Sequence, residues 1–227
     1  MKFKDTFSNF LKTLLVIGIF YSGLAYASYL FINPQDYQYT ADDYPPYFFE
    51  RTPNTNNFIK VTDTQNTFQF RTYKLESKID MMTYKAKVKP TLLKWGEGIH
   101  PYDTQSHEAS GLSKTIEQTI EEDLFDGSLE NEIHVATYEG NIEAVSYATS
   151  ADISAPEIKT LIANPEGLAV NQTTTVKGGG SALLDYTLQR YKARGIEKVQ
   201  LLSTQDEYYL NRGWKVKSNA NEACTVM

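Results

Sequence analysis

Residues Thr175 to Gly195 read T-V-K-G-G-G-S-A-L-L-D-Y-T-L-Q-R-Y-K-A-R-G, so three consecutive glycines lead directly into an amphipathic segment. The spacing predicts a helix from about Ser181 to Arg194, which Gly195 ends as a C′ glycine. Glycine has no Cβ, so a ligand can approach its backbone closely. The first turn of a helix has free N–H groups at the positive end of its dipole. These features predict a phosphate cradle at the glycines.

The glycine pattern by itself leaves a second interpretation open, namely a flexible loop that feeds a helix. The sequence has no G-x-x-x-x-G-K-[ST], so a P-loop is excluded, and it has no G-x-G-x-x-G of a dinucleotide-binding turn. The surrounding elements therefore have to decide between the two interpretations.

Those elements predict one α/β domain. Two alternating runs, Glu132–Tyr138 and Ile142–Thr149, flank the turn signal Glu139-Gly140-Asn141, which predicts an antiparallel hairpin. A helix capped by Ser113 should precede it and run to about Phe125. The other predicted elements are strands in Phe58–Leu75, at Ile158–Ala163 and at Lys198–Ser203, a short helix over Asp206–Asn211 and a last strand from Trp214. The strands joined by the glycine-led helix should lie parallel in one sheet.

The glycine loop and the segment after it resemble the GNAT superfamily of acetyl-CoA-dependent N-acetyltransferases. That family carries a Gln/Arg-x-x-Gly-x-Gly/Ala loop, and residues 175–180 take its place, with Thr175 at the Gln/Arg position. The family also has an aromatic-Tyr pair three residues before Gly-aromatic, which Tyr208-Tyr209-Leu210-Asn211-Arg212-Gly213-Trp214 matches. The resemblance covers about Ser113 to Val216. It implies an α+β fold with a mixed, mostly antiparallel central sheet flanked by helices.

The resemblance implies transfer of an acetyl group from acetyl-CoA, as co-substrate, to an amine acceptor of unknown type. Tyr209 matches the family's general acid. Backbone N–H groups would hold the pyrophosphate, and the splayed end of the fourth strand would pair with the pantetheine arm and polarise the thioester carbonyl. The expected cofactor-binding residues are Ala163, Asn164, Val176, Lys177, Gly178, Gly179, Gly180, Ser181 and Ala182. By position, the candidate bases are Glu157, Glu166 and Glu143.

The end of that fourth strand has two interpretations. In the first, the strand is Ile158–Ala163 and Asn164–Thr175 is an inserted mobile loop. In the second, Gly167–Val170 is the last part of the strand, because Val170 lies at the usual distance from the glycines. We favour the first.

The N-terminal segment Thr13–Ile32 is twenty residues long and has no charge, which is enough to span a bilayer as a helix. Lysines before it and aspartates after it favour a translocated C-terminal part. The alternatives are a signal peptide cleaved after Ala25-Tyr26-Ala27 and, less favoured because the stretch has no polar face, a buried core helix. The predicted organisation is a hydrophobic anchor or signal segment (1–32), a linker or arm (33–57), the GNAT-like domain (58–217) and a tail (218–227).

The overall composition excludes some partners. With a formal net charge of −6 and no run of Lys or Arg, nucleic acid is not an expected partner. The three histidines, His100, His107 and His134, have no metal-ligand spacing, so no metal site is expected. The single cysteine, Cys224, lies in a C-terminal C-a-a-X sequence, which would predict farnesylation in a eukaryotic cell.

The two ends of the chain predict a membrane-anchored or secreted protein, whereas acetyl-CoA is a cytosolic-type cofactor. The second functional hypothesis is therefore a GNAT-fold membrane-anchored subunit that binds or scaffolds without turnover.

Overall fold

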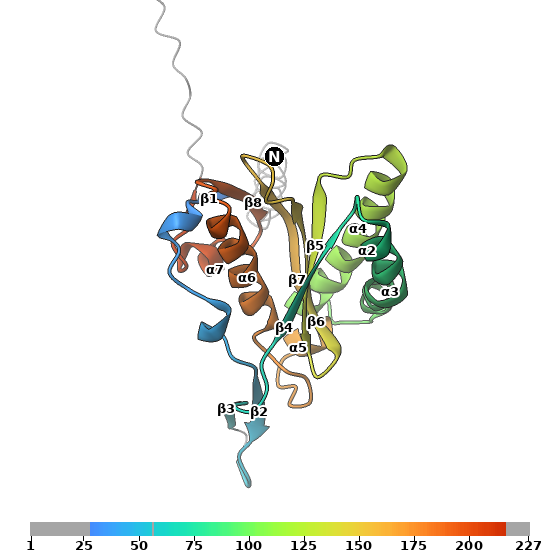
Figure 1. Ribbon diagram of the computed structural model, residues 1–227. Helices are drawn as coiled ribbons and strands as arrows, with labels where there is room; N and C mark the ends of the chain where they lie inside the picture. Colours follow the sequence, from blue (N-terminus) through green and yellow to red (C-terminus); the bar gives the residue numbers. More distant parts are fainter. Residues whose placement is uncertain (1–27, 56, 217–227) are drawn as a thin grey trace, which may run out of the picture.

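The computed structural model describes residues 28–55 and 57–216 (Figure 1). A seven-stranded sheet with the order β4-β5-β6-β7-β8-β1-β9 forms its centre, and a separate two-stranded sheet consists of β2 and β3. The strands are β1 (Ser28–Ile32), β2 (Tyr47–Arg51), β3 (Phe58–Thr62), β4 (Gln69–Lys74), β5 (Asn131–Tyr138), β6 (Asn141–Thr149), β7 (Glu157–Ala163), β8 (Val199–Ser203) and β9 (Lys215–Val216). The helices are η1 (Pro34–Asp36), η2 (Ala41–Asp43), α2 (Lys78–Thr83), the π-helical η3 (Tyr84–Val88), α3 (Lys89–Glu97), α4 (Gln105–Asp126), α5 (Pro165–Leu168), α6 (Gly179–Ala193) and α7 (Asp206–Leu210).

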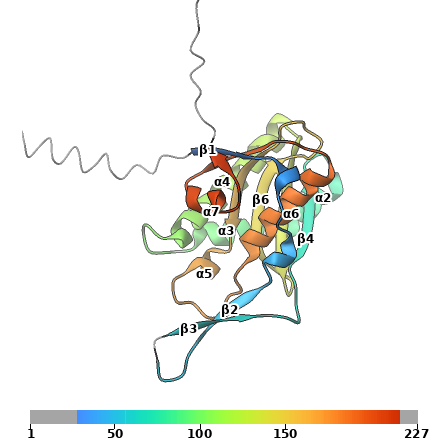
Figure 2. The ribbon, with the colours of Figure 1, turned by 90° about the vertical axis from the view of Figure 1, so that its left-hand side faces the viewer.

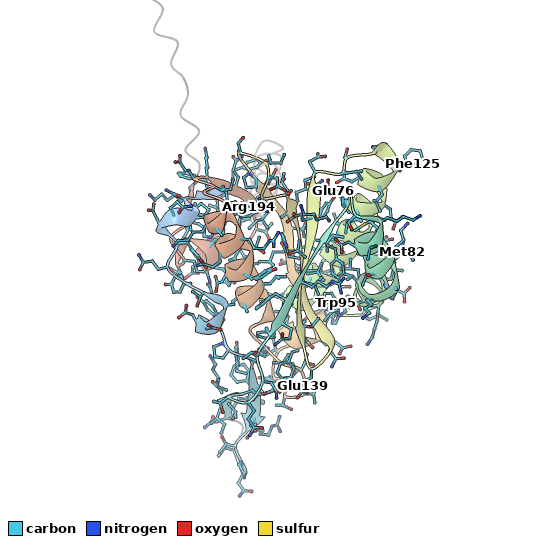
Figure 3. All side chains as sticks on the ribbon, in the orientation of Figure 1. Glu76, Met82, Trp95, Phe125, Glu139 and Arg194 are labelled. Carbon is cyan, nitrogen blue, oxygen red and sulfur yellow. The ribbon has the colours of Figure 1, made fainter. Side chains whose placement is uncertain are left out.

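Helices cover both faces of the large sheet (Figure 1). One layer contains α2, α3 and α4, and its buried side chains, such as Trp95, join those of β5 and β6 in one apolar cluster. The other layer contains α6, which packs with β1 and β8 in a second cluster. Met82 and Phe125 point outward from the first layer (Figure 3). The mixed, mostly antiparallel sheet flanked by helices is therefore confirmed.

The β5–β6 hairpin confirms the turn signal in the sequence. Glu139 and Gly140 both have positive φ angles, 48° and 82°, which is the backbone that a two-residue hairpin turn requires. Glu139 lies at the tip of the hairpin (Figure 3).

Helix α4 begins earlier than predicted. Its N-cap is Thr104, whose Oγ1 accepts a hydrogen bond from the His107 N–H at 3.2 Å. Ser113 is buried inside the helix, where its hydroxyl donates to the Ala109 carbonyl, so the prediction of Ser113 as the cap was wrong. The buried face of the first turns of α4 consists of small residues, so these turns show no apolar periodicity in the sequence. Ser110 there donates to the Trp95 carbonyl of α3 at 2.8 Å.

Strand β1 corrects the predicted hydrophobic helix at its C-terminal end. Residues Ser28–Ile32 lie between β8 and β9, antiparallel to both, and Leu30 is 0% exposed. These five residues belong to the sheet of the domain, so the helix predicted to run to Ile32 was wrong there. The rest of that segment, the cleavage signal and Cys224 lie outside the described residues. Within residues 28–55 and 57–216, no helix is long and apolar enough to cross a membrane.

The predicted arm lies over the domain surface. Its helices η1 and η2 pack on α6, and Tyr37 between them is buried. The arm then continues into the β2–β3 hairpin, which projects from one end of the sheet (Figure 2). The sheet therefore begins with β1, upstream of the domain start expected at Phe58.

The parallel pairing of β7 with β8 is confirmed, but it is short. Only Glu157 with Gln200 and Ile158 with Leu201 are paired. Beyond Ile158 the two strands part, and this splay opens the central sheet.

Candidate functional site

A cavity of about 870 Å³ lies where β7 and β8 separate. Its walls come from β7, the end of β8, the first turn of α6, the N-terminal half of α4, α7 and the β2–β3 hairpin. Such a volume lies within the range of small-molecule sites. The lining residues used below are Tyr44, Tyr47, Phe49, Lys60, Glu108, Glu143, Leu161, Ala163, Asn164, Val176, Lys177, Gly178, Gly179, Gly180, Ser181, Tyr208, Tyr209 and Arg212.

The absence of a side chain has a different consequence at each of Gly178, Gly179 and Gly180. Gly178 is the N-cap of α6 with φ 102°, a conformation that L side chains rarely adopt. A Cβ on Gly179 would lie 3.1 Å from the Glu143 Cβ, so α6 approaches β6 closely there. A Cβ on Gly180 would meet only the Ala163 Cβ, at an ordinary 3.4 Å. Gly180 is thus the position at which a longer side chain would enter the cavity without a clash near its root.

The hydrogen bonds of the loop narrow the set of predicted phosphate donors. The Ala182 N–H donates to the Gly178 carbonyl at 3.0 Å, and Ala182 is fully buried, so this N–H is already paired within the helix. The Lys177 N–H donates to the Tyr47 carbonyl at 2.8 Å and is likewise taken. Val176 lines the cavity but is 94% buried. The first-turn N–H groups of Gly179, Gly180 and Ser181 remain, as expected for a helix start.

The open edge of β7 supplies a second set of backbone groups. The Asn164 N–H donates to the Glu143 carbonyl of β6 at 2.9 Å. Hydrogen-bonding directions alternate along a strand, so the N–H groups of Leu161 and Ala163 point away from β6. They face the side from which β8 has separated. An extended ligand could pair with this edge as a further strand would.

Arg212 lies beside the first turn of α6. Its guanidinium stacks on the Tyr208 ring at 3.9 Å and donates to the Ser181 hydroxyl at 3.3 Å. The Tyr208 hydroxyl is 2.9 Å from the same Ser181 oxygen, and the Tyr44 ring covers the guanidinium at 4.9 Å. Arg212 forms no ion pair among the described residues, so its charge is available at the glycine loop. The sequence gives no local signal for this role, because α7 and α6 meet only in the fold.

Tyr209 lines the cavity from α7. Its ring contacts Trp214 and Tyr208 edge to face, with centroids 5.6 Å and 4.9 Å apart. Burial, reinforced by the neighbouring Tyr208, raises the pKa of the Tyr209 hydroxyl, so it stays protonated around neutral pH. A phenol held in this form can donate a proton.

The three candidate bases have different positions. Glu157 lies at the paired start of β7 and does not line the cavity, and Glu166 is exposed on α5 and does not line it either. Glu143 of β6 does line it, and its carboxylate accepts a hydrogen bond from Asn164 Nδ2 at 3.0 Å. Burial raises the pKa of Glu143, while that hydrogen bond opposes the shift. Of the three candidate bases, Glu143 is therefore the one that the fold brings to the cavity.

The loop after β7 decides where that strand ends. Strand β7 stops at Ala163, and residues 165–168 form the short helix α5 instead of a strand, which supports the strand bounds of the first interpretation. Gln172 braces the loop, since its amide donates to the Gly167 and Thr175 carbonyls and accepts from the Thr174 and Thr175 N–H groups. Lys177 Nζ also donates to the Gly167 carbonyl, and burial lowers its pKa.

The sequence model of the acetyltransferase (GNAT) domain family matches residues 104–217, which is half of the chain. The chain belongs to the GNAT acetyltransferase family. The match includes α4, the glycine loop and α7, and thus every element that the motifs identified. The described strands β1 to β4 lie outside it.

Comparison with known proteins gives distant structural neighbours. No curated protein matches the chain. Similar solved structures include a protein of unknown function from Staphylococcus epidermidis (13% identity, TM-score 0.42, 84% of this chain and 57% of that one) and a GCN5-related N-acetyltransferase from Kribbella flavida (12%, 0.40, 84% and 54%). Another is the PaiA N-acetyltransferase from Thermoplasma acidophilum in complex with coenzyme A (16%, 0.37, 68% and 94%). The chain spans little more than half the length of the first two.

Proposed function

We propose that this GNAT protein is an N-acetyltransferase that binds acetyl-CoA in the cavity between β7 and β8 and transfers the acetyl group to an amine. One observation carries the proposal. The glycine-led first turn of α6 and the unpaired edge of β7 line the same cavity. Backbone N–H groups that suit a diphosphate therefore lie beside backbone groups that suit an extended chain.

The residues present fit coenzyme A chemically. The N–H groups of Gly179, Gly180 and Ser181 suit a diphosphate, and Arg212 adds a positive charge beside them. Arg212 thereby offsets the loss of the family's Gln/Arg at Thr175. The Leu161 and Ala163 backbone groups suit the amides of the pantetheine arm.

The same cavity holds the groups that acetyl transfer needs. The amine nitrogen attacks the thioester carbonyl carbon, and the C–S bond breaks. Glu143 would take the proton that the ammonium must lose, directly or through water, since its raised pKa makes it a stronger base than an exposed carboxylate. Tyr209 would give a proton to the departing thiolate. Backbone N–H groups of β7 would stabilise the negative charge on the carbonyl oxygen.

The charge of the cavity favours a cationic acceptor at one end. Glu108 lines it from α4 and accepts a hydrogen bond from Gln205 Nε2 at 3.4 Å. A carboxylate there would attract an ammonium group. This supports an amine acceptor and leaves its size open.

A GNAT-fold subunit without turnover is the second candidate, and the departure at Thr175 favours it. Full-length protein titrated with acetyl-CoA by calorimetry, followed by a thiol-release assay with a panel of amines, separates the two. Gly180→Glu should keep the fold and abolish binding, because its carboxylate would occupy the diphosphate position. Gly180→Ala is the matched control and should still bind. Binding without thiol release for any amine would favour the subunit. Absence of binding by folded protein would overturn the acetyltransferase and leave a structural subunit.

A further inference from the structure

One face of the β2–β3 hairpin forms part of the cavity wall. Side chains alternate across a strand, and Phe49 is paired with Lys60, so Tyr47, Phe49 and Lys60 share a face. All three line the cavity. The opposite face holds the hairpin in place, because Phe48 packs edge to face against Tyr138 with centroids 5.9 Å apart.

The hairpin is joined to the glycine loop by its backbone. The Tyr47 N–H donates to the Lys177 carbonyl at 3.2 Å, and the Lys177 N–H donates to the Tyr47 carbonyl at 2.8 Å. Lys177 thus extends the small sheet by one residue, immediately before Gly178. The first turn of α6 and the hairpin face are therefore parts of one surface.

This surface alternates cations with aromatic rings. Lys60 Nζ lies 4.0 Å from the centre of the Tyr47 ring, and Lys177 Nζ lies 5.5 Å from that of Phe49. Farther out, the Arg51 guanidinium lies 5.5 Å from the centre of the Phe58 ring. None of the ion pairs between described residues involves Lys60, Lys177 or Arg51. In a chain with a net charge of −6, such a group of unpaired cations attracts an anion.

The direction of the glycine loop shows which part of a ligand would reach the hairpin. Gly180 faces Ala163 of β7, whereas Gly178 faces Pro45 and Tyr47 of the arm. A molecule that spans the loop with its extended arm along β7 must leave on the Gly178 side. An ammonium acceptor does not suit that side, because lysines would repel it. The carboxylates of the cavity wall, Glu108 and Glu143, come from α4 and β6 and not from the hairpin.

We infer that the hairpin face made of Tyr47, Phe49 and Lys60, together with Lys177, is the subsite for the 3′-phosphoadenosine half of coenzyme A. The lysines meet the 3′-phosphate, and the aromatic rings offer their faces to the adenine. The inference rests on the proposed function, since it assigns one half of the same ligand.

The test compares acetyl-CoA with its 3′-dephospho analogue by calorimetry on the full chain. Wild type should bind acetyl-CoA about tenfold or more tightly than the analogue, because a lysine–phosphate contact is charge-assisted. Lys60→Gln should remove most of this preference and leave the affinity for the analogue nearly unchanged. Phe49→Leu should lower the affinity for acetyl-CoA and for the analogue by the same factor. Lys85→Gln, an exposed lysine of η3 outside the cavity wall, is the matched control and should keep the preference.

The outcomes separate the two proposals. If wild type binds both ligands equally, or if Lys60→Gln keeps the preference, the hairpin subsite is wrong while the acetyl-CoA site stands. If folded wild type binds neither ligand, the proposed function fails and the subsite fails with it.

Discussion

Tyr37 in the arm donates a hydrogen bond to the carboxyl group of Asp185 in α6, and both side chains are buried. The contact joins the N-terminal arm to the helix whose first turn forms the glycine cradle, one turn before Asp185. The second carboxyl oxygen, Oδ2, is buried without a hydrogen-bond partner among the described residues. Burial raises the pKa of Asp185 to about 7, with Asp43 acting in the same direction and the Tyr37 hydrogen bond and Arg212 opposing it.

This carboxyl group should make the stability of the fold depend on pH. Its folded-state pKa lies above the unfolded value of about 3.9, so the folded state binds more protons between these two values. We expect the Asp185 contribution to be most favourable below about pH 4, to decline through about pH 7 and to be lost above it. Asp185→Asn should flatten the pH dependence of the free energy of unfolding, measured by urea denaturation at several pH values from 5 to 8. An identical pH dependence in the variant would contradict the assignment.

Gly178→Ala should destabilise the protein. The residue has φ 102°, and a Cβ would lie 3.3 Å from the Pro45 carbonyl oxygen, so strain and crowding act together. The expected loss is about 1–3 kcal/mol in the free energy of unfolding. Gly111→Ala is the control, because that glycine lies in α4 with nothing near its Cβ position. It should stabilise the helix by about 0.5–1 kcal/mol. Equal effects from the two substitutions would show that the Gly178 backbone is not strained.

Tyr209→Phe should lower kcat about 100-fold or more with little change in acetyl-CoA affinity, because it removes the proposed proton donor and keeps the ring contact with Trp214. Tyr208→Phe should instead weaken affinity, since the Tyr208 hydroxyl bonds Ser181 in the cradle. Thiol release and calorimetry measure the two quantities separately. If Tyr209→Phe retained full kcat, Tyr209 would be a packing residue only.

Arg212→Gln should weaken acetyl-CoA binding about tenfold and reduce its dependence on salt, because a cation beside the diphosphate is lost. Arg212→Lys keeps the charge but not the planar group that stacks on Tyr208, so an intermediate affinity is expected. Arg71→Gln is the control, as Arg71 does not line the cavity. Calorimetry at two salt concentrations is the measurement. If Arg212→Gln bound acetyl-CoA as tightly as wild type, Arg212 would make no contribution and backbone N–H groups alone would bind the diphosphate.

Local signals in the sequence predicted the half of the fold that surrounds the cradle. Glu139-Gly140-Asn141 fixed the β5–β6 hairpin, because only a tight turn suits those residues between two alternating runs. The glycines and Gly195 placed both ends of α6 to within about two residues. These signals depend on neighbours in the chain, which a sequence displays directly.

The missed features depend on contacts between distant segments. Arg212 reaches Ser181 across 31 positions, so no spacing rule could have selected it. Glu143 was one of three candidate bases, and only its contact with Asn164, 21 positions away, distinguishes it from the other two. Strand β1 was missed for another reason. Its residues continue an uncharged run, and a strand buried in a sheet has the same apolar composition as the end of a membrane helix.

Strand β1 leads to a prediction about the limits of the folding unit. Leu30 is 0% exposed and packs with Leu201 and Trp214, and β1 pairs with β8 along five residues. A chain that begins at Asn33 lacks this strand and leaves the edge of β8 open. We expect it to lose cooperative unfolding, whereas a chain that begins at Ser28 should retain it. Circular dichroism during urea unfolding measures both.

A point substitution in the full chain tests the packing of β1 without shortening the chain. Leu30→Ala should cost about 2–5 kcal/mol, the usual effect of truncating a buried leucine. Leu202→Ala is the control, because Leu202 in β8 is 48% exposed and should change stability little. If Leu30→Ala were as mild as Leu202→Ala, and the chain from Asn33 still unfolded cooperatively, β1 would not belong to the folded core.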